Sequence, residues 1–298
     1  MPPSPSYLGY RTASAIARCL PEAAIAPTSR IAGLVAPHLM KDRAAMAARH
    51  QQRARPDLDG AELNAAVRAV FSSYVHYWLE SFRLPGTTAA KLDSGFSHEG
   101  FDHVLRGLDA GRGVILALPH LGGWEWAGFW LTAVRDIPMS VVVEQVEPPE
   151  LAEWFTSWRS RFGMEVIPLD ASAGTKASAA LAANHVLSLI CDRDISDNGV
   201  PVVLLGEETT MPAGPATLAI RSGAPLIPAA VYLDEHGYHH GVAREPIDTT
   251  RRGKLRADVA RITQDLADAI GELILAAPEQ WHLLQPNWPS DRSGAEDR

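Results

Sequence analysis

The feature that most constrains the fold is an alternation between short apolar runs and longer amphipathic stretches, which begins near residue 110. The apolar runs are residues 114–118, 139–143, 186–190, 202–205 and 225–231. The helical stretches are residues 124–134, 151–162, 171–184, 214–222 and 259–276. Runs that are apolar on both faces are typical of buried strands, and strands that alternate with helices form parallel sheets. The pattern predicts an α/β fold, with a mostly parallel central sheet covered by helices on both faces.

The chain before this alternation is predicted to be helical. Residues 7–20 and 31–40 are rich in alanine and carry apolar residues three and four positions apart. The same spacing is clearest over residues 61–84, where Pro85-Gly86 ends the pattern. We therefore expect one domain over residues 1–298, with a helical N-terminal layer over 1–95 and an α/β core over 96–298.

Composition and charge exclude several classes of function. Apolar residues make up 46% and the net charge is −8, which is typical of a globular protein and argues against nucleic acid as a partner. Cys19 and Cys191 stand in no metal-like or redox-like spacing, so a reducing compartment is expected. The most apolar stretch, residues 113–134, contains a proline, a histidine and a glutamate. We therefore expect no membrane-spanning helix, and the N-terminal residues lack the pattern of a secretory signal.

A basic segment interrupts this acidic background. It contains Lys41, Arg43, Arg49, Arg53 and Arg55, with Asp42 as its one acid. One interpretation is contact with anionic lipid head groups, aided by apolar residues of the preceding helix that could enter the membrane interface. Those apolar residues are Ile31, Leu34, Val35, Leu39 and Met40. The alternative is an ordinary solvated helix face or loop.

The sharpest local motif is Pro119-His120-Leu121-Gly122-Gly123-Trp124-Glu125, which follows a predicted strand and leads into a predicted helix. Ligands of open α/β sheets bind beyond the carboxyl ends of strands. On one regular helix, two residues five apart point about 140° away from each other. His120 and Glu125 can therefore meet only if His120 lies in the loop and Glu125 in the first helical turn. A histidine so placed can act as a general base, although a structural role is the alternative.

Other motifs are discounted. His236, His239 and His240 could suggest a metal site, but a hairpin tip between two strands explains them better, and no metal is expected. No phosphate-binding glycine loop and no G-x-S-x-G elbow follows a predicted strand. Nucleotide-driven transfer and serine-hydrolase chemistry therefore lack support.

Here the sequence resembles a known family. His120, four residues and Glu125 after a strand resemble the H-x4-D/E motif of glycerolipid-type acyltransferases. The combined pattern resembles the bacterial lipid A lauroyl/myristoyl acyltransferase family over residues 7–290, and its closing motif is similar to the actinobacterial branch that includes phosphatidylinositol mannoside acyltransferases. The other matching segments are residues 77–85, Asp192-Arg193-Asp194 with Gly199 and residues 205–207, residues 214–216 with 221–228, and the closing residues 278–286.

The resemblance implies that a long fatty acyl chain moves from acyl-CoA to a mannose hydroxyl of a phosphatidylinositol mannoside, with His120 as general base. Acyl-CoA is a co-substrate, and no cofactor is expected. The expected partners are acyl-CoA, the glycolipid acceptor and an anionic membrane surface, with no nucleic acid. A peripheral monomer on the cytoplasmic face of the inner membrane is expected. Lipid A or another glycolipid is an alternative acceptor, and a non-catalytic lipid-binding protein is a further alternative.

The resemblance leaves the acid that supports His120 open. Glu125 is the acid of the motif itself, whereas Asp192 or Asp194 matches the branch in which a later acid takes this role. The alternative for the two aspartates is a salt-bridge cluster in a loop, and Asp192 is also a candidate for binding substrate.

Three further residues are expected to bind substrate. Arg159 matches an arginine that would bind phosphate, although a basic residue at a helix C-terminus is common for electrostatic reasons alone. Glu144 follows a predicted strand and is placed to hydrogen-bond sugar hydroxyls. Trp124 would line an acyl groove together with Trp126, Phe129 and Trp130, or these rings form plain core.

Overall fold

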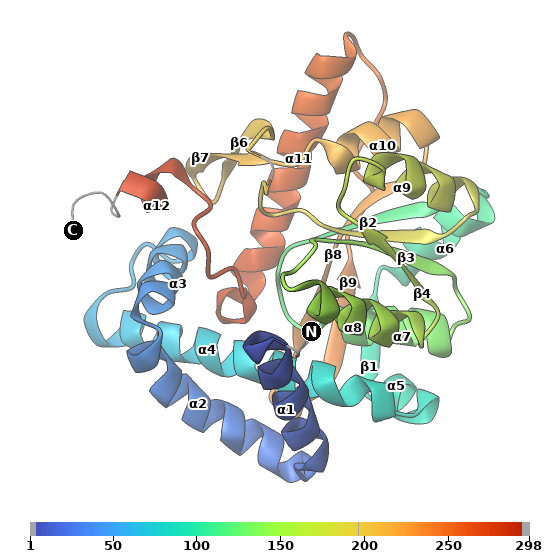
Figure 1. Cartoon of the computed structure of the whole chain (residues 1–298). Helices are drawn as coiled ribbons and strands as arrows, with labels where there is room; N and C mark the ends of the chain where they lie inside the picture. Colours follow the sequence, from blue (N-terminus) through green and yellow to red (C-terminus); the bar gives the residue numbers. More distant parts are fainter. Residues whose placement is uncertain (1–3, 196, 294–298) are drawn as a thin grey trace.

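The computed structural model describes residues 4–195 and 197–293. Its centre is a seven-stranded sheet in the order β1-β9-β8-β2-β5-β3-β4 (Figure 1). The strands that run parallel to one another are β2 (Val114–Leu118), β3 (Met139–Val143), β4 (Met164–Pro168), β5 (Val186–Ile190) and β8 (Leu226–Leu233). The reversed pair at one edge is β1 (Phe96–Glu99) and β9 (His239–Ala243), where β9 pairs antiparallel with β8. The predicted α/β fold is confirmed.

The strands that the apolar pattern missed lie mainly at the edges of this sheet. β1 and β4 are its two outermost strands, and most of their residues are at least partly exposed. Edge strands of this kind mix polar and apolar residues, so they produce no continuous apolar run. The run at residues 202–205 corresponds to β6 (Val200–Leu204), which leaves the central sheet and pairs with β7 (Glu207–Met211) alone.

Helices cover both faces of the sheet, as predicted. On one face, the buried side chains of β2 and β5 pack against α9 (Ala173–Ala182), α10 (Gly214–Ser222) and α11 (Leu255–Ala276). On the other face, Val114 and Val186 belong to a second core with α6 (Phe101–Asp109), α7 (Trp124–Ala133) and α8 (Pro149–Ser160). Successive residues of one strand alternate between these cores, because side chains of a strand point alternately to its two faces. Figure 1 shows α9 and α10 on the opposite side of the strands from α7 and α8.

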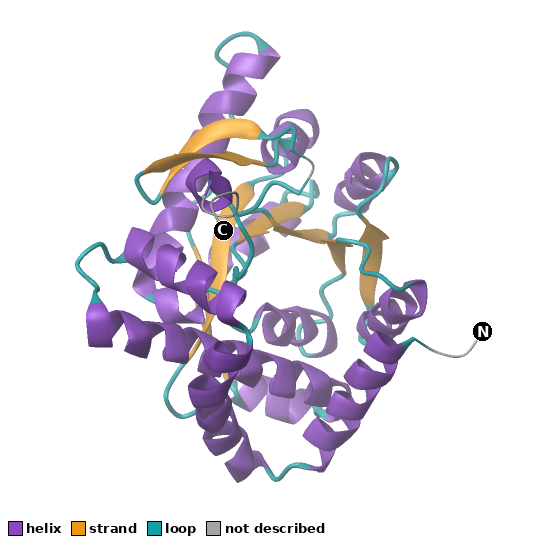
Figure 2. Ribbon diagram, turned by 60° about the vertical axis from the view of Figure 1, so that its left-hand side comes forward, coloured by secondary structure: helices purple, strands orange, loops and turns teal. Residues whose placement is uncertain are grey.

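The first part of the chain forms a helical layer against this core (Figure 2). Its helices are α1 (Pro5–Cys19), α2 (Ile25–Leu39), α3 (Lys41–Ala54), α4 (Gly60–Arg83) and α5 (Ala89–Ser94). α2 lies directly on α4, where a Cβ at Gly33 would stand 2.6 Å from the carbonyl oxygen of Arg68. Glycine at this position therefore allows the two backbones to approach closely. In the part of the chain that the structure describes, no helix is both long and apolar enough to cross a bilayer.

The basic segment forms helix α3, and part of it is used inside the protein. The Arg53 guanidinium lies 2.7 Å from Glu207 and 2.8 Å from Asp291, and it stacks on the Trp288 ring. Arg49 donates to the carbonyl oxygen of Asp291 at 3.0 Å. These two side chains hold the C-terminal part of the chain, and the exposed cations of the segment are Lys41 and Arg43.

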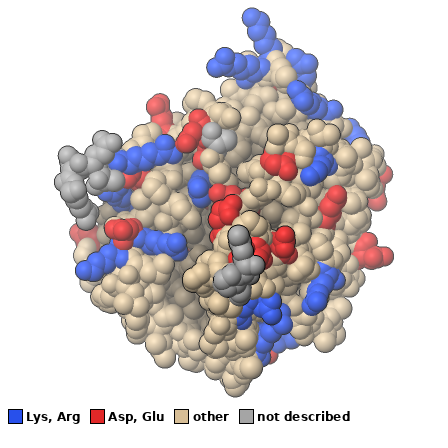
Figure 3. All heavy atoms as spheres, in the orientation of Figure 1, with Lys and Arg blue, Asp and Glu red and all other residues tan. Residues whose placement is uncertain are grey.

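The apolar residues expected at a membrane interface are exposed on α2. These residues, called the apolar row, extend from Ile31 to the C-cap Met40, and the surface over α2 is a largely uncharged area at the lower left of Figure 3. The row consists of Ile31, Leu34, Val35, Leu39 and Met40. Solvent-facing apolar side chains that gather in this way mark an interaction surface more often than isolated ones do.

Candidate active site

The loop between β2 and α7 carries His120 and is held against β8. The N–H of Gly122 donates to Gln280 O at 3.0 Å, and the N–H of Gly123 donates to Val231 O at 3.1 Å. Gly122 has a φ of +59°, and a Cβ there would stand 1.7 Å from Val231 O. Only glycine fits this close passage. The loop therefore places His120 beyond the carboxyl end of β2.

His120 forms a pair with Asp192, which follows the neighbouring strand β5. The His120 Nδ1 atom lies 2.6 Å from Asp192 Oδ1, and the His120 N–H donates to Asp192 Oδ2 at 3.0 Å. Asp192 is fully buried, whereas the His120 side chain is 35% exposed. With Nδ1–H donating to the carboxylate, Nε2 keeps its lone pair for a proton from a substrate.

The charge of Asp192 controls the protonation of His120. Burial alone would lower the pKa of His120, but the adjacent carboxylate outweighs burial and raises this pKa above its ordinary value. Burial alone would raise the pKa of Asp192, yet the nearby imidazole and its hydrogen bonds hold that pKa below its ordinary value. The pair therefore favours an ionised carboxylate beside a base that readily accepts a proton.

Glu125 lies in the first turn of α7, as expected, but it is bonded elsewhere. Its Oε1 atom accepts from the Tyr77 hydroxyl at 2.8 Å and from Arg159 Nη2 at 3.1 Å. Burial raises the pKa of Glu125 against the lowering effect of the Arg159 guanidinium. The structure thus joins Glu125 to Arg159, and it joins His120 to Asp192.

Arg159 is held on several sides in the wall of the site. Besides its bond to Glu125, its guanidinium lies 5.4 Å from the centroid of the Trp124 ring and 5.6 Å from that of Phe155. Its side chain is largely buried, and its buried Nε atom has no hydrogen-bond partner among the residues that the structure describes. A guanidinium fixed by a carboxylate and aromatic faces is oriented before any ligand arrives.

The remaining candidates line the same cavity. Glu144 follows β3, and its charge contributes to the raised pKa of His120. Asp194 lies two residues after Asp192, where its Oδ2 atom accepts from the Gly199 N–H at 2.7 Å and from the Thr210 hydroxyl at 3.1 Å. These bonds tie together the loop after β5 and strand β7.

His120, Arg159, Glu144, Asp194 and Trp124 line one cavity of about 1300 Å³, whereas the buried Asp192 and Glu125 reach it through His120 and Arg159. The segments that follow β2, β3, β4 and β5 line it from the carboxyl edge of the sheet, where ligands of such sheets bind. Helices α4, α8, α9 and α10 and the segment near residue 282 also line it. The cavity therefore connects the exposed part of His120 to Arg159 and Glu144.

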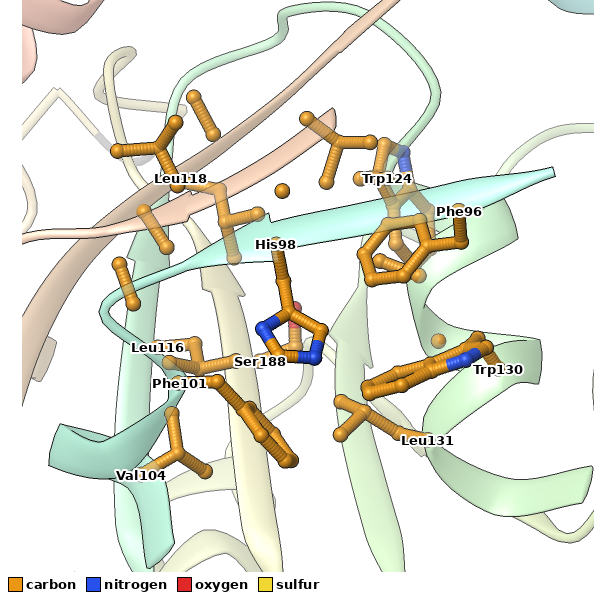
Figure 4. Close-up of a pocket in the computed structure, with 18 of the residues that line it drawn as sticks. Phe96, His98, Phe101, Val104, Leu116, Leu118, Trp124, Trp130, Leu131 and Ser188 are labelled. Atoms are coloured by element: carbon orange, nitrogen blue, oxygen red, sulfur yellow. The ribbon is translucent and has the colours of Figure 1, made fainter. Parts of the chain in front are cut away.

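A second, small cavity of about 60 Å³ lies beside the large one and is almost entirely apolar. Trp124 lines both cavities. The rings of Phe96, Phe101 and Trp130 surround the small cavity (Figure 4). It suits an apolar group more than a polar one.

Sequence reasoning assigned no role to two residues of the closing motif. The Trp281 indole N–H donates to Asp192 Oδ2 at 2.8 Å, and the His282 N–H donates to the His120 carbonyl oxygen at 2.7 Å. The His282 Nε2 atom lies 2.9 Å from the Ser73 hydroxyl, and burial lowers the pKa of His282 to about 3. The closing motif marked Trp281 and His282 in the sequence. No spacing rule, however, predicts that they contact Asp192 and His120, which lie far away along the chain.

The discounted histidines have separate partners. The buried His239 ring lies 3.3 Å from Glu80, whereas His240 lies 2.8 Å from the Ser97 hydroxyl, and both belong to β9. His236 lies in the turn between β8 and β9 beside Glu235. The predicted hairpin is present, although its second strand begins at His239.

An imidazole–carboxylate pair that faces a large cavity is able to catalyse acyl transfer, and the chain belongs to the family of bacterial lipid A biosynthesis acyltransferases, whose model matches residues 6–290. The predicted family is therefore confirmed. The chain is 39% identical over 232 residues to a phosphatidylinositol mannoside acyltransferase of Mycolicibacterium smegmatis, a match that covers 76% of this chain and 73% of that protein. It is 40% identical over 232 residues to a protein of the same name from Mycobacterium tuberculosis, covering 76% of this chain and 71% of that protein.

Proposed function

We propose that this acyltransferase moves a long fatty acyl chain from acyl-CoA to a mannose hydroxyl of a phosphatidylinositol mannoside. The observation that carries the proposal is the His120–Asp192 pair, which presents an imidazole of raised pKa to the large cavity. The names of the mycobacterial relatives support the acceptor. Acyl-CoA is the acyl donor, and no cofactor takes part.

The reaction begins when His120 Nε2 takes the proton of the acceptor hydroxyl. The hydroxyl oxygen attacks the thioester carbonyl carbon, and the new C–O bond forms as the carbonyl electrons move to oxygen. The C–S bond then breaks, and the imidazolium returns the proton to the CoA thiolate. The ionised Asp192 stabilises the imidazolium between these steps and fixes the tautomer of the free base.

The other cavity residues bind the two substrates. Arg159 binds a phosphate of the substrates through its guanidinium fork, and Glu144 accepts hydrogen bonds from sugar hydroxyls. The apolar cavity behind Trp124 receives part of the fatty chain, because its lining offers almost no polar contact. Asp192 orients His120, and Asp194 holds the loop after β5 through its bond to Gly199.

The proposed assay measures thiol release from palmitoyl-CoA, with and without a mannosylated phosphoinositide. Slow hydrolysis that the acceptor stimulates, together with formation of an acylated glycolipid, supports the proposal. Stimulation by lipid A precursors alone would change the acceptor and keep the chemistry. Binding of both lipids without thiol release would contradict an enzymatic role.

We expect Glu125→Gln to raise KM for the phosphoinositide acceptor about tenfold, because the neutral amide no longer holds the Arg159 guanidinium in place. The pH at which kcat/KM falls on the acid side should stay where it is, because Glu125 is bonded to Tyr77 and Arg159 and not to His120. Steady-state kinetics across pH measure both quantities. Arg159→Lys is the matched variant and should raise the same KM. An acid limb that moves in Glu125→Gln would make Glu125 the partner of His120 after all.

We further propose that the protein binds the cytoplasmic face of the membrane as a peripheral monomer, with the apolar row of α2 in the interface and Lys41 and Arg43 near anionic head groups. Leu34→Asp should lower partitioning onto vesicles of anionic phospholipid by about tenfold or more, because burial of one leucine is worth about 1.5–3 kcal/mol. Leu275→Asp is the control, because Leu275 is 49% exposed on α11 and Leu34 is 56% exposed on α2. Cosedimentation measures the partitioning. Equal losses in the two variants would show that α2 has no special role.

A further inference from the structure

The C-terminal strap, defined as residues 278–291, crosses the loop between β2 and α7 and contacts both members of the His120–Asp192 pair. Two of its backbone bonds hold the loop, from Gly122 N–H to Gln280 O at 3.0 Å and from His282 N–H to His120 O at 2.7 Å. The Asn287 side chain donates to the Asp192 carbonyl oxygen at 3.0 Å. The strap therefore touches the segments after β2 and after β5 at once.

We propose that Trp281 of this strap is a positioning residue of the catalytic pair, whose indole N–H fixes the Asp192 carboxylate in the orientation that His120 needs. Asp192 Oδ2 accepts the indole N–H at 2.8 Å and the His120 N–H at 3.0 Å, which leaves Oδ1 for the imidazole at 2.6 Å. Each carboxylate oxygen thus has its own donors. A carboxylate held by fixed donors cannot rotate away when the imidazole becomes charged.

The indole is itself rigid. Trp281 is 1% exposed, and its ring stacks on His50 of α3 with the centroids 5.0 Å apart. It meets Trp288 edge to face at 6.1 Å. A buried donor in such packing has one available direction, which is the direction of the Asp192 carboxylate.

The strap is locked to α3 at its far end by Asp291. Asp291 Oδ2 accepts from the N–H groups of Asn287 at 3.0 Å and Trp288 at 3.1 Å, and it lies 3.3 Å from His50 Nε2. Arg53 lies 2.8 Å from the other carboxylate oxygen. The buried Asp291 therefore joins the N-terminal layer to the strap, and the strap carries Trp281 to the site.

The kinetic part of the test rests on the proposed function. Trp281→Phe keeps an aromatic ring but removes the donor, and it should lower kcat at least about tenfold with little change in KM, because a hydrogen bond to a charged group is lost. Incorporation of benzothienylalanine in place of Trp281 keeps the shape of the side chain and should give the same loss, so the test survives if the phenylalanine variant folds poorly.

Trp288→Phe is the matched control. Its indole N–H donates to the Glu207 carbonyl oxygen at 3.3 Å, and phenylalanine keeps an aromatic ring against Trp281, so kcat should fall far less than in Trp281→Phe. In the background of Asp192→Asn, Trp281→Phe should change kcat by less than about twofold, because its effect passes through the carboxylate. Equal losses for Trp281→Phe and Trp288→Phe, or losses that multiply in the double variant, would overturn the proposal.

A second readout does not depend on any acyl transfer. The His120 Nδ1–H proton can be followed by NMR at low field, with His120→Ala to assign the signal. It should be protected from exchange in the parent protein and in Trp288→Phe, and lost to exchange in Trp281→Phe. An unchanged signal in Trp281→Phe would refute the positioning role, even if the substrates proved to be other than proposed.

Discussion

His120→Ala is expected to lower kcat for acyl transfer by about three orders of magnitude or more, the largest effect of any single substitution in the site. Among the described residues that line the cavity, His120 joins an imidazole of raised pKa to a buried carboxylate, whereas burial lowers the pKa of the other imidazole, His282, to about 3. We therefore expect no neighbouring residue to replace His120 as a base. Thiol release and product formation measure the loss.

The control for His120→Ala is His236→Ala, in the exposed turn between β8 and β9, which should keep full activity. The melting temperature of His120→Ala should remain near that of the parent. If most of the activity persisted in the folded His120→Ala variant, the mechanism proposed here would be wrong.

Asp192→Asn is expected to have the second largest effect, a loss of about 100- to 10,000-fold in kcat, because the amide neither stabilises the imidazolium nor fixes the tautomer. It should also move the acid limb of the pH–rate profile to lower pH. In the parent, Asp192 raises the pKa of His120 against the effect of burial, so the base becomes protonated already above the ordinary pKa of histidine. Without that charge, the lowering effect of burial remains, and the pKa of His120 falls. Profiles of kcat/KM against pH measure the shift.

Asp194→Asn serves as the comparison for this shift. Asp194 is bonded to Gly199 and Thr210, so its amide variant should leave the acid limb where it is. A limb that moved to higher pH in Asp192→Asn, or that moved equally in both variants, would contradict the assignment of Asp192.

The strands of the central sheet could be predicted because burial on both faces leaves a local trace in the sequence. Residues 114–118, 139–143 and 186–190 form strands with these same bounds. The outermost strands leave no such trace, because one side of each faces solvent or a loop. The role of Arg53 in the basic helix α3 could not be predicted either, because its partners lie far away in the sequence. The basic residues of this helix suggested a lipid-facing surface, whereas Arg53 is in fact neutralised by Glu207 and Asp291 from far along the chain.

The sequence indicated which residues gather at the candidate site, but it could not predict which of them form hydrogen bonds with one another. Helical geometry correctly placed His120 in a loop and Glu125 in the first turn that follows. It could not tell which acid meets the imidazole, because that depends on which strand lies beside β2. The neighbour is β5, and so the acid is Asp192, while Glu125 turns toward α4 and α8.

The strap also sets the order in which a working site can arise during translation. The imidazole of His120 is synthesised first, the carboxylate follows 72 residues later, and the indole that orients it comes 89 residues after that. A ribosome that has completed the sheet has therefore made a protein whose catalytic pair still lacks its anchor. Because loss of this anchor is expected to lower kcat about tenfold, the proposed acyl transfer should reach its full rate only after the strap has left the ribosome and docked on α3.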